Sequence, residues 1–84
     1  MGSSKSLHTR EYRLVRRVLL GMREGAGLSQ RALGEKLGRP YSFVYKCEAG
    51  ERRIDPLELI LWCRACDCNP AQVVKDLEKQ FGRT

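Results

Sequence analysis

Apolar residues in the first part of the chain recur every three to four positions, which is the spacing of one face of an α-helix. The residues that carry this pattern are Leu14, Val15, Val18, Leu19 and Met22. Thr9 can cap the start of such a helix, and Gly25 and Gly27 end it, because each glycine costs about 1 kcal/mol inside a helix. The pattern therefore predicts a first amphipathic helix over residues 9–24.

Two shorter helical segments follow, over residues 30–37 and 40–49, with a turn of about three residues between them. Ser29 can accept a backbone hydrogen bond at the start of the first segment. Gly38 suits the left-handed conformation that ends a helix, and Pro40 suits the first turn of the next one. Two short helices joined by a tight turn are typical of a helix-turn-helix, whose second helix lies in the major groove of DNA.

The last third of the chain predicts two more helices. Asp55 caps and Pro56 opens a fourth helix that ends at residues 68–69, and a fifth extends over residues 70–80. The apolar residues of the fourth helix are Leu57, Leu59, Ile60, Leu61, Cys63 and Cys66. Because it is the most apolar helix, we expect it in the middle of the core. No strand pattern occurs, so the sequence predicts an all-α fold of five short helices.

Length and composition limit the fold to one domain. A chain of 84 residues cannot support two cores, so we assign a single domain to residues 9–82, behind a flexible tail over residues 1–8. Hydrophobic residues at 42% and charged residues at 31% are typical of a folded protein rather than a disordered one. No apolar stretch approaches the ~20 residues that cross a bilayer, and no signal-peptide core follows the tail, so no membrane association and a cytoplasmic location are expected.

Charge and helix geometry together favour a nucleic acid as the partner. Sixteen Lys and Arg against ten Asp and Glu give a net charge of +6, which attracts polyanions. In a helix-turn-helix, Val44 and Cys47 hold the second helix on the core, and Gly34 permits the close approach of the two helices. The outer face then carries Tyr41, Ser42, Tyr45 and Lys46. The arginines of the first helix are either a solvated face or a contact to flanking DNA.

The order and spacing of these residues resemble the Cro and phage-repressor type of regulator, the Xre family. The similarity rests on Met22, Arg23, Glu24, Gly27, Leu28, Ser29, Gln30, Leu33, Gly34, Lys36, Leu37, Gly38, Glu48 and Gly50, and continues through Pro56, Leu57, Leu61 and the corner at residues 67–70. It covers residues 10–80 without a gap. The resemblance implies a five-helix, lambda-repressor-like domain that binds double-stranded DNA as a dimer, with its helix-turn-helix at helices two and three.

The same resemblance implies roles for individual residues. The positions that match DNA contacts are Gln30, Tyr41, Ser42, Lys46, Arg52 and Arg53; Tyr45 is added from its place on the outer face of the second short helix, and Arg39 from its place in the turn. Gln30 is expected on a phosphate, because its amide and the helix N-terminus both suit an anion. The arginines are expected on the DNA backbone, and the residues of the second short helix are expected at the bases. Arg23 and Glu48 match a pair that bridges the first and third helices, which we interpret as structural.

Three positions depart from the family pattern. Pro40 and Tyr41 stand where relatives often have Gln or Ser, so Tyr41 is expected to stack on a sugar or contact a thymine methyl, and the operator sequence cannot be read. Gly34 replaces the usual alanine, which preserves the close approach of the helices at a cost of up to ~1 kcal/mol in helix propensity. Asp67 replaces a usual glycine, so the corner before the fifth helix is expected to be built differently.

Four cysteines allow a metal site, a redox site or simple packing. Cys63 and Cys66 lie three apart on one helical face near Cys68, but no histidine lies near enough to be a fourth ligand. Free cysteine packs well as a small hydrophobe, so packing is the favoured interpretation for these three and Cys47, and no metal or cofactor is expected. His8 has no nucleophile in register beside it, so no enzyme activity is expected.

The sequence therefore predicts a dimeric, sequence-specific transcriptional regulator, with repression as the favoured outcome and reading helices ~34 Å apart. The dimer interface is expected at the fifth helix or the loop before it. The alternative is an antitoxin or protein-interaction module that retains the fold with weak or no base readout, motivated by Pro40 and Tyr41. A third hypothesis is a thiol sensor that couples oxidation or metal at Cys63, Cys66 and Cys68 to the dimer.

Overall fold

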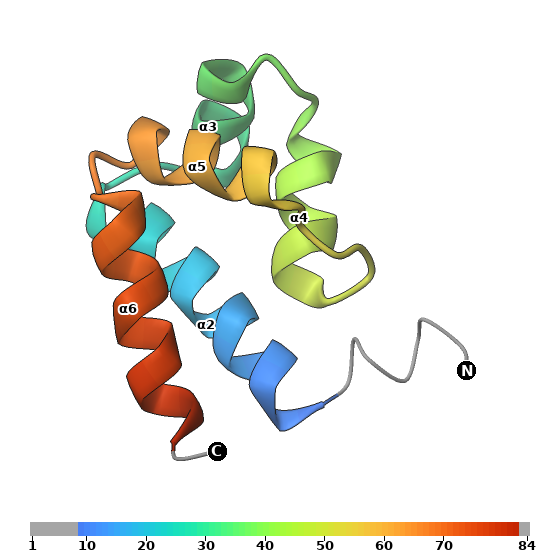
Figure 1. Ribbon diagram of the computed structural model, residues 1–84. Coiled ribbons are helices and arrows are strands. Elements are labelled where there is room, and N and C mark those ends of the chain that lie inside the picture. Colours follow the sequence, from blue (N-terminus) through green and yellow to red (C-terminus); the bar gives the residue numbers. More distant parts are fainter. Residues whose placement is uncertain (1–8, 83–84) are drawn as a thin grey trace.

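A computed structural model describes residues 9–82 as five α-helices without strands (Figure 1). They are α2 (Arg10–Gly25), α3 (Gln30–Leu37), α4 (Tyr41–Ala49), α5 (Pro56–Ala65) and α6 (Pro70–Phe81). The prediction of an all-α fold is confirmed. The fourth helix ends at Ala65, earlier than the sequence indicated, and the predicted tail over residues 1–8 lies outside the described residues.

Helix starts are defined by side chains that accept backbone hydrogen bonds, which satisfies N–H groups that have no partner within the helix. The bonds at α2, α3 and α6 run from Tyr12 N to Thr9 (3.1 Å), from Ala32 N to Ser29 (3.0 Å) and from Gln72 N to Asn69 (3.0 Å). At α5, Asp55 and Glu58 form a reciprocal capping box. Pro40 precedes α4 as its N-cap without a side-chain bond. Each predicted start is thus within one residue of the observed one.

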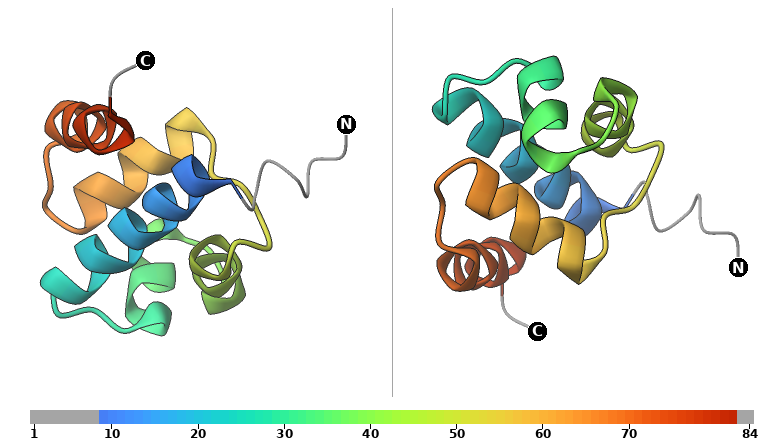
Figure 2. Two further views of the ribbon diagram at one scale, coloured as in Figure 1. Left: turned by 90° about the horizontal axis from the view of Figure 1, so that it is seen from below. Right: turned by 90° about the horizontal axis from the view of Figure 1, so that it is seen from above.

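The helices surround one core. α3 packs on α4, α2 packs on both α4 and α6, and α5 packs on α3 and α6. Figures 1 and 2 show α6 and α4 on opposite sides of the molecule, with α2 between them. The fully buried side chains are Leu19, Leu33, Val44, Cys47, Trp62 and Cys63. Trp62 donates its indole N–H to the carbonyl of Leu19 at 3.2 Å, and its ring centroid lies 6.3 Å from that of Phe43.

The burial of α5 differs from the sequence-based expectation. Only one face of this helix enters the core, through Trp62 and Cys63, while Leu57, Ile60 and Leu61 are 65%, 39% and 42% exposed. The error has a physical cause. High apolar content does not show how many neighbours a helix has, and α5 packs mainly on α3 and α6, with Trp62 reaching α2 and α4.

The two ends of the helical array are defined by a left-handed residue at the α5–α6 corner and by hydrogen bonds between α2 and α6. Asp67, in the corner between α5 and α6, has a φ of 63°, the left-handed conformation that a glycine adopts more readily. The corner therefore keeps a residue in the left-handed conformation, although aspartate stands where the family usually has glycine. At the other end, Arg10 donates to the carbonyls of Gln80 (3.2 Å) and Phe81 (3.3 Å), which ties the start of α2 to the end of α6. No helix within residues 9–82 is long and apolar enough to cross a membrane.

Candidate nucleic-acid interface

α4 presents an outer face that is free of core contacts over much of its length. Tyr41 and Tyr45, one turn apart, are 48% and 47% exposed, Lys46 is exposed and Ser42 is partly exposed. The opposite face, with Phe43, Val44 and Cys47, is buried. The guanidinium carbon of Arg31 on α3 lies 4.6 Å from the centroid of the Tyr41 ring. An arginine of α3 thus lies beside the first turn of the exposed face.

The turn between α3 and α4 depends on Gly34. A Cβ atom at this position would lie 2.8 Å from the carbonyl oxygen of Arg39 and 3.3 Å from backbone atoms of Pro40 and Tyr41. These are main-chain atoms, which cannot move aside without altering the turn. Gly38 has a φ of 68° and closes α3 in the left-handed conformation. The absence of a side chain at Gly34 therefore sets how closely α4 can approach α3.

A largely buried polar cluster joins α2, the start of α3 and α4. Arg23 donates to Glu48 through Nε (2.6 Å) and Nη2 (3.0 Å), and to the carbonyl of Leu28 through Nη1 (2.8 Å). The hydrogen bond to Glu48 raises the pKa of Arg23, so its guanidinium stays charged. Gln30 donates to the same carboxylate at 3.0 Å. This bond uses one of the two N–H groups of the amide and joins the start of α3 to the Arg23–Glu48 pair.

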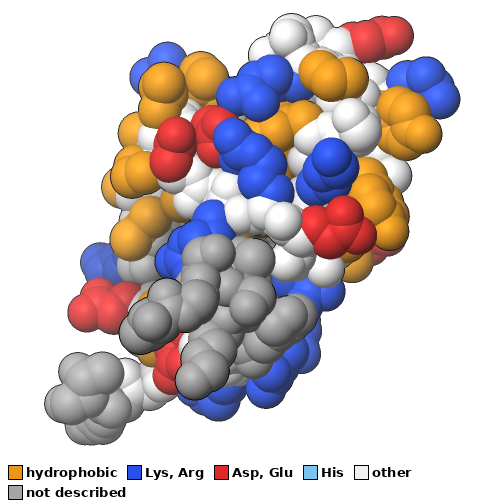
Figure 3. Space-filling view, turned by 90° about the vertical axis from the view of Figure 1, so that its right-hand side faces the viewer, with side chains coloured by type: hydrophobic (Ala, Val, Ile, Leu, Met, Phe, Trp, Pro, Cys, Tyr) orange, Lys and Arg blue, Asp and Glu red, His pale blue; other side chains and the backbone are white. Residues whose placement is uncertain are grey.

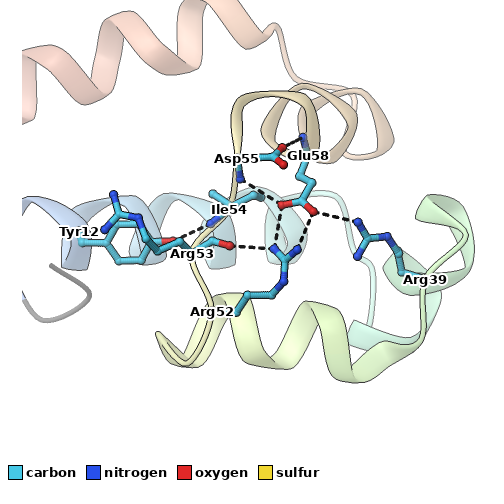
Figure 4. Close-up of polar contacts among 7 residues, drawn as sticks. All are labelled: Tyr12, Arg39, Arg52, Arg53, Ile54, Asp55 and Glu58. Carbon is cyan, nitrogen blue, oxygen red and sulfur yellow. Dashed lines mark hydrogen bonds and ion pairs between the residues drawn. The ribbon is translucent and has the colours of Figure 1, made fainter. Parts of the chain in front are cut away.

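A second cluster centres on Glu58, which is buried at the start of α5 (Figure 4). Arg52 binds both of its carboxylate oxygens, each at 2.8 Å, and Arg39 binds one at 2.9 Å. The backbone N–H of Asp55 adds a bond of 3.1 Å. These donors, Arg52 above all, lower the pKa of Glu58 to about 2 against the opposing effect of burial.

The Glu58 cluster changes the interpretation of the arginines near α4. Arg39 and Arg52 lie over the ring of Phe43, with guanidinium carbons 4.1 and 4.9 Å from its centroid. Their side chains remain 40% and 39% exposed, so each arginine is held in one orientation with part of its surface in solvent. Arg53 lies 4.9 Å from the ring of Tyr12, whose hydroxyl accepts the N–H of Ile54 at 3.0 Å. Sequence reasoning missed Glu58, although its spacing three residues after Asp55 is the signal of a capping box.

Comparison with known proteins agrees with this geometry. A family model described as a helix-turn-helix domain matches residues 15–75. An XRE-family like protein from Pseudomonas syringae pv. tomato str. DC3000 has 36% sequence identity, covers 95% of this chain and 98% of its own, and superposes with a TM-score of 0.82. The chain belongs to the XRE family of helix-turn-helix proteins. The comparison with curated proteins gives no match.

Membership of the XRE family makes the domain a DNA-binding one and not an enzyme. The positions named from sequence fall into two groups. Ser42, Tyr45 and Lys46 lie on the outer face of α4, and Tyr41 lies there beside Arg31. The side chains with contacts inside the domain are Gln30, Arg39, Arg52 and Arg53. The residues of the first group share the outer face of α4. Those of the second group are held by contacts in the turn and loops around that helix or at the start of α3.

Basic side chains gather around α4 in this XRE domain. Figure 3 views the side of the molecule on which α4 lies, and shows several Lys and Arg side chains in the middle of this face, with hydrophobic side chains on both sides and a few acidic ones among them. Positive charge beside an exposed helix raises the local concentration of polyanions and speeds their encounter with the protein. The charge distribution therefore agrees with a DNA-binding face that includes α4.

The cysteines of the XRE domain lie mainly in its interior. Cys47, Cys63 and Cys66 are buried, and Cys68 is partly buried. Burial raises the pKa of all three buried thiols, that of Cys66 to about 11, so they stay protonated and unreactive near neutral pH. Within residues 9–82 no cluster of three or more potential ligands could hold a metal ion. These features favour packing over a thiol sensor, whose cysteines would be exposed and readily ionised.

Proposed function

We propose that the protein is a sequence-specific transcriptional regulator that binds double-stranded DNA as a dimer and represses by occupying its operator. The observation that carries this proposal is the outer face of α4, where Tyr41, Tyr45 and Lys46 are exposed while the opposite face is fully packed. A helix held in this way can enter the major groove, which is wide enough to admit it. A bacterial regulator of this kind acts in the cytoplasm, where the chromosome is.

The two groups of residues are assigned different parts in binding. Ser42, Tyr45 and Lys46 are proposed to meet base edges, together with Tyr41 at the first turn. Gln30, Arg39, Arg52 and Arg53 are proposed to contact phosphates. The bonds of Arg39 and Arg52 to Glu58 reduce the entropy that each side chain loses on binding, but also reduce its charge toward DNA. Specificity is therefore expected to depend on α4 more than on the arginines around it.

Lys46→Ala is expected to lower operator affinity by about 10- to 100-fold, because a direct base contact contributes about 1–3 kcal/mol. Lys46 is the best position to change, since its side chain is exposed and the substitution leaves both polar clusters intact. Lys75→Ala removes the same charge from an exposed residue of α6, the helix on the opposite side of the molecule from α4, and serves as the control.

The operator is first obtained by selection from random duplexes at about 150 mM salt, which suppresses non-specific binding. Recovery of a pseudo-palindrome supports the proposal, and equal affinity of the Lys46 and Lys75 variants contradicts the role of α4. Selection without any motif, combined with a stoichiometric protein partner in a pull-down, would favour the antitoxin or interaction module. The bonding of Arg39 and Arg52 within the domain is the observation that favours this second function.

The dimer interface is proposed to include the exposed apolar face of α5. Leu57, Ile60 and Leu61 lie at positions i, i+3 and i+4, so they share one side of the helix, and all three are exposed. A cluster of this kind on a small protein is typical of an interaction site. A second copy of the chain is the occupant, because a pseudo-palindromic operator requires two reading helices about one DNA turn (~34 Å) apart.

Leu57→Glu is expected to convert the dimer into a monomer, as measured by sedimentation equilibrium. The residue is 65% exposed, so the substitution should leave folding intact while it buries an unpaired charge in the interface. Val74→Glu on α6, where Val74 is 52% exposed, is the matched control. A dimer that survives Leu57→Glu but not Val74→Glu would place the interface on α6, as the sequence indicated.

A further inference from the structure

A basic hollow lies at the junction of α2 and α4. Its lining residues are Arg13, Arg16, Arg17, Leu20 and Glu48. The four α2 residues follow the spacing i, i+3, i+4 and i+7, so they form one face of that helix. The hollow measures about 210 Å³, several times the ~30 Å³ that one water molecule occupies in the liquid. There is room for an anionic group of the size of a phosphate.

The charge inside this hollow is positive although Glu48 lines it. The carboxylate of Glu48 is already neutralised, because Arg23 binds both oxygens and Gln30 binds one of them. Arg23 of α2 and Gln30 of α3 make these bonds, whereas Arg13, Arg16 and Arg17 of α2 line the hollow itself. An anion in the hollow would therefore meet arginines rather than an unpaired carboxylate.

Arg16 offsets the partial negative charge at the C-terminus of α4, which would otherwise repel an anion. The C-terminus of a helix carries partial negative charge, which repels phosphates. Arg16 donates from Nε to the carbonyl of Glu48 at 3.1 Å, in the last turn of α4. Its guanidinium lies directly over Gly50, where an added Cβ would come within 3.0 Å of it. This arginine thus offsets the helix dipole at the end of α4 that borders the hollow.

The position of the hollow relative to the outer face of α4 indicates its ligand. Tyr41, Tyr45 and Glu48 are spaced i, i+4 and i+7, so they follow one line along α4, and this line ends at the hollow. When the exposed turns of α4 lie in the major groove, the far end of that line meets the sugar-phosphate backbone at the groove edge. A DNA phosphate is the anion that this geometry brings to the arginines.

We propose that the arginine hollow on α2 is a second backbone-binding site that grips DNA phosphates flanking the bases read by α4. The site rests on the proposed DNA-binding function and extends its footprint to α2, outside the helix-turn-helix. Arg13 and Arg17 are the residues that contact phosphate. Arg16 is a positioning residue, because its guanidinium is bonded to the end of α4.

Salt dependence of DNA binding tests the proposal. Each phosphate contact contributes about 0.9 to the slope of log affinity against log salt concentration, so Arg13→Gln with Arg17→Gln is expected to reduce the slope by about 1.8. The probe is a mixed-sequence duplex of about 30 base pairs, long enough to cover flanks on both sides of one bound domain. The double variant Lys75→Gln with Lys79→Gln, on exposed residues of α6, makes the same charge change and is expected to leave the slope unaltered.

The outcomes separate this site from the rest of the interface. Arg13→Lys with Arg17→Lys retains both charges and is expected to give the slope of the unmodified protein. If the glutamine variant had lost slope because α2 packs poorly, this recovery would not be expected. An unchanged slope in the glutamine variant, or the same decrease in the α6 control, overturns the proposal. Failure of the proposed function would be seen differently, as the absence of a selected motif for the unmodified protein. The salt slope on the mixed-sequence duplex does not depend on a motif. Comparing the unmodified protein with the glutamine variant would therefore still report whether the hollow binds phosphates.

Discussion

Gly34→Ala is expected to destabilise the protein, whereas Gly21→Ala is expected to stabilise it, although both glycines lie within helices. A Cβ at Gly34 would lie 2.8 Å from the carbonyl oxygen of Arg39, while a Cβ at Gly21 meets nothing within 4 Å. Overpacking against backbone costs about 1–3 kcal/mol, which exceeds the gain of up to about 1 kcal/mol in helix propensity. At Gly21 only the gain remains.

Urea denaturation followed by circular dichroism measures both effects. The two variants differ by the same methyl group, so their midpoints should move in opposite directions from that of the unmodified protein. Operator affinity should fall for Gly34→Ala alone, because the methyl group displaces the start of α4 from α3. Equal stabilisation of both variants would show that the turn can relax around a side chain, and the close approach would then not limit the position of α4.

Glu58→Gln is expected to lower the free energy of unfolding by about 2–3 kcal/mol at pH 7, because the pKa of Glu58 in the folded state lies well below its ordinary value. The folded pKa is about 2, against 4.5 for the unconstrained group. The stabilisation is fully present above pH 4.5 and is lost as the pH falls from 4.5 toward 2. The glutamine variant lacks this stabilisation at every pH, so the free energies of unfolding of the two proteins should converge in acid.

Urea denaturation at pH 7 and pH 3 tests this convergence. Glu78→Gln, on an exposed residue of α6, removes the same charge outside the Glu58 cluster and controls for the change in net charge. A difference between Glu58→Gln and the unmodified protein that is constant with pH would contradict the assigned ionisation. Loss of the Glu58 carboxylate should also increase the mobility of the loop that contains Arg52, since Arg52 joins this loop to α5 through both carboxylate oxygens.

The helices could be predicted because local signals define them. Ser29, Asp55 and Asn69 each accept a backbone bond at a helix start, and Gly38 and Gly50 end helices in the left-handed conformation. These interactions span a few residues and depend on residue type alone. How α5 packs depends on contacts with helices distant in sequence, so its exposed apolar face could not be anticipated from its composition.

The candidate interface was predictable in outline but not in its bonding. The exposed positions of α4 follow from helical periodicity once the buried residues Val44 and Cys47 are recognised. The bonds of Arg39 and Arg52 to Glu58 join three separate segments, and no local pattern shows which carboxylate an arginine will meet. The same limit applies to the arginine hollow, whose lining combines α2 with a residue from the end of α4.

The buried indole of Trp62 makes the protein its own optical probe. It is the single tryptophan of the chain, it has no exposed surface, and it connects α5 to the backbone of α2 and to the ring of Phe43 on α4. Its fluorescence should shift to longer wavelength only when these helices separate and water reaches the ring. DNA bound at the outer face of α4 would not contact it, so one emission spectrum can monitor the integrity of the core during a DNA titration.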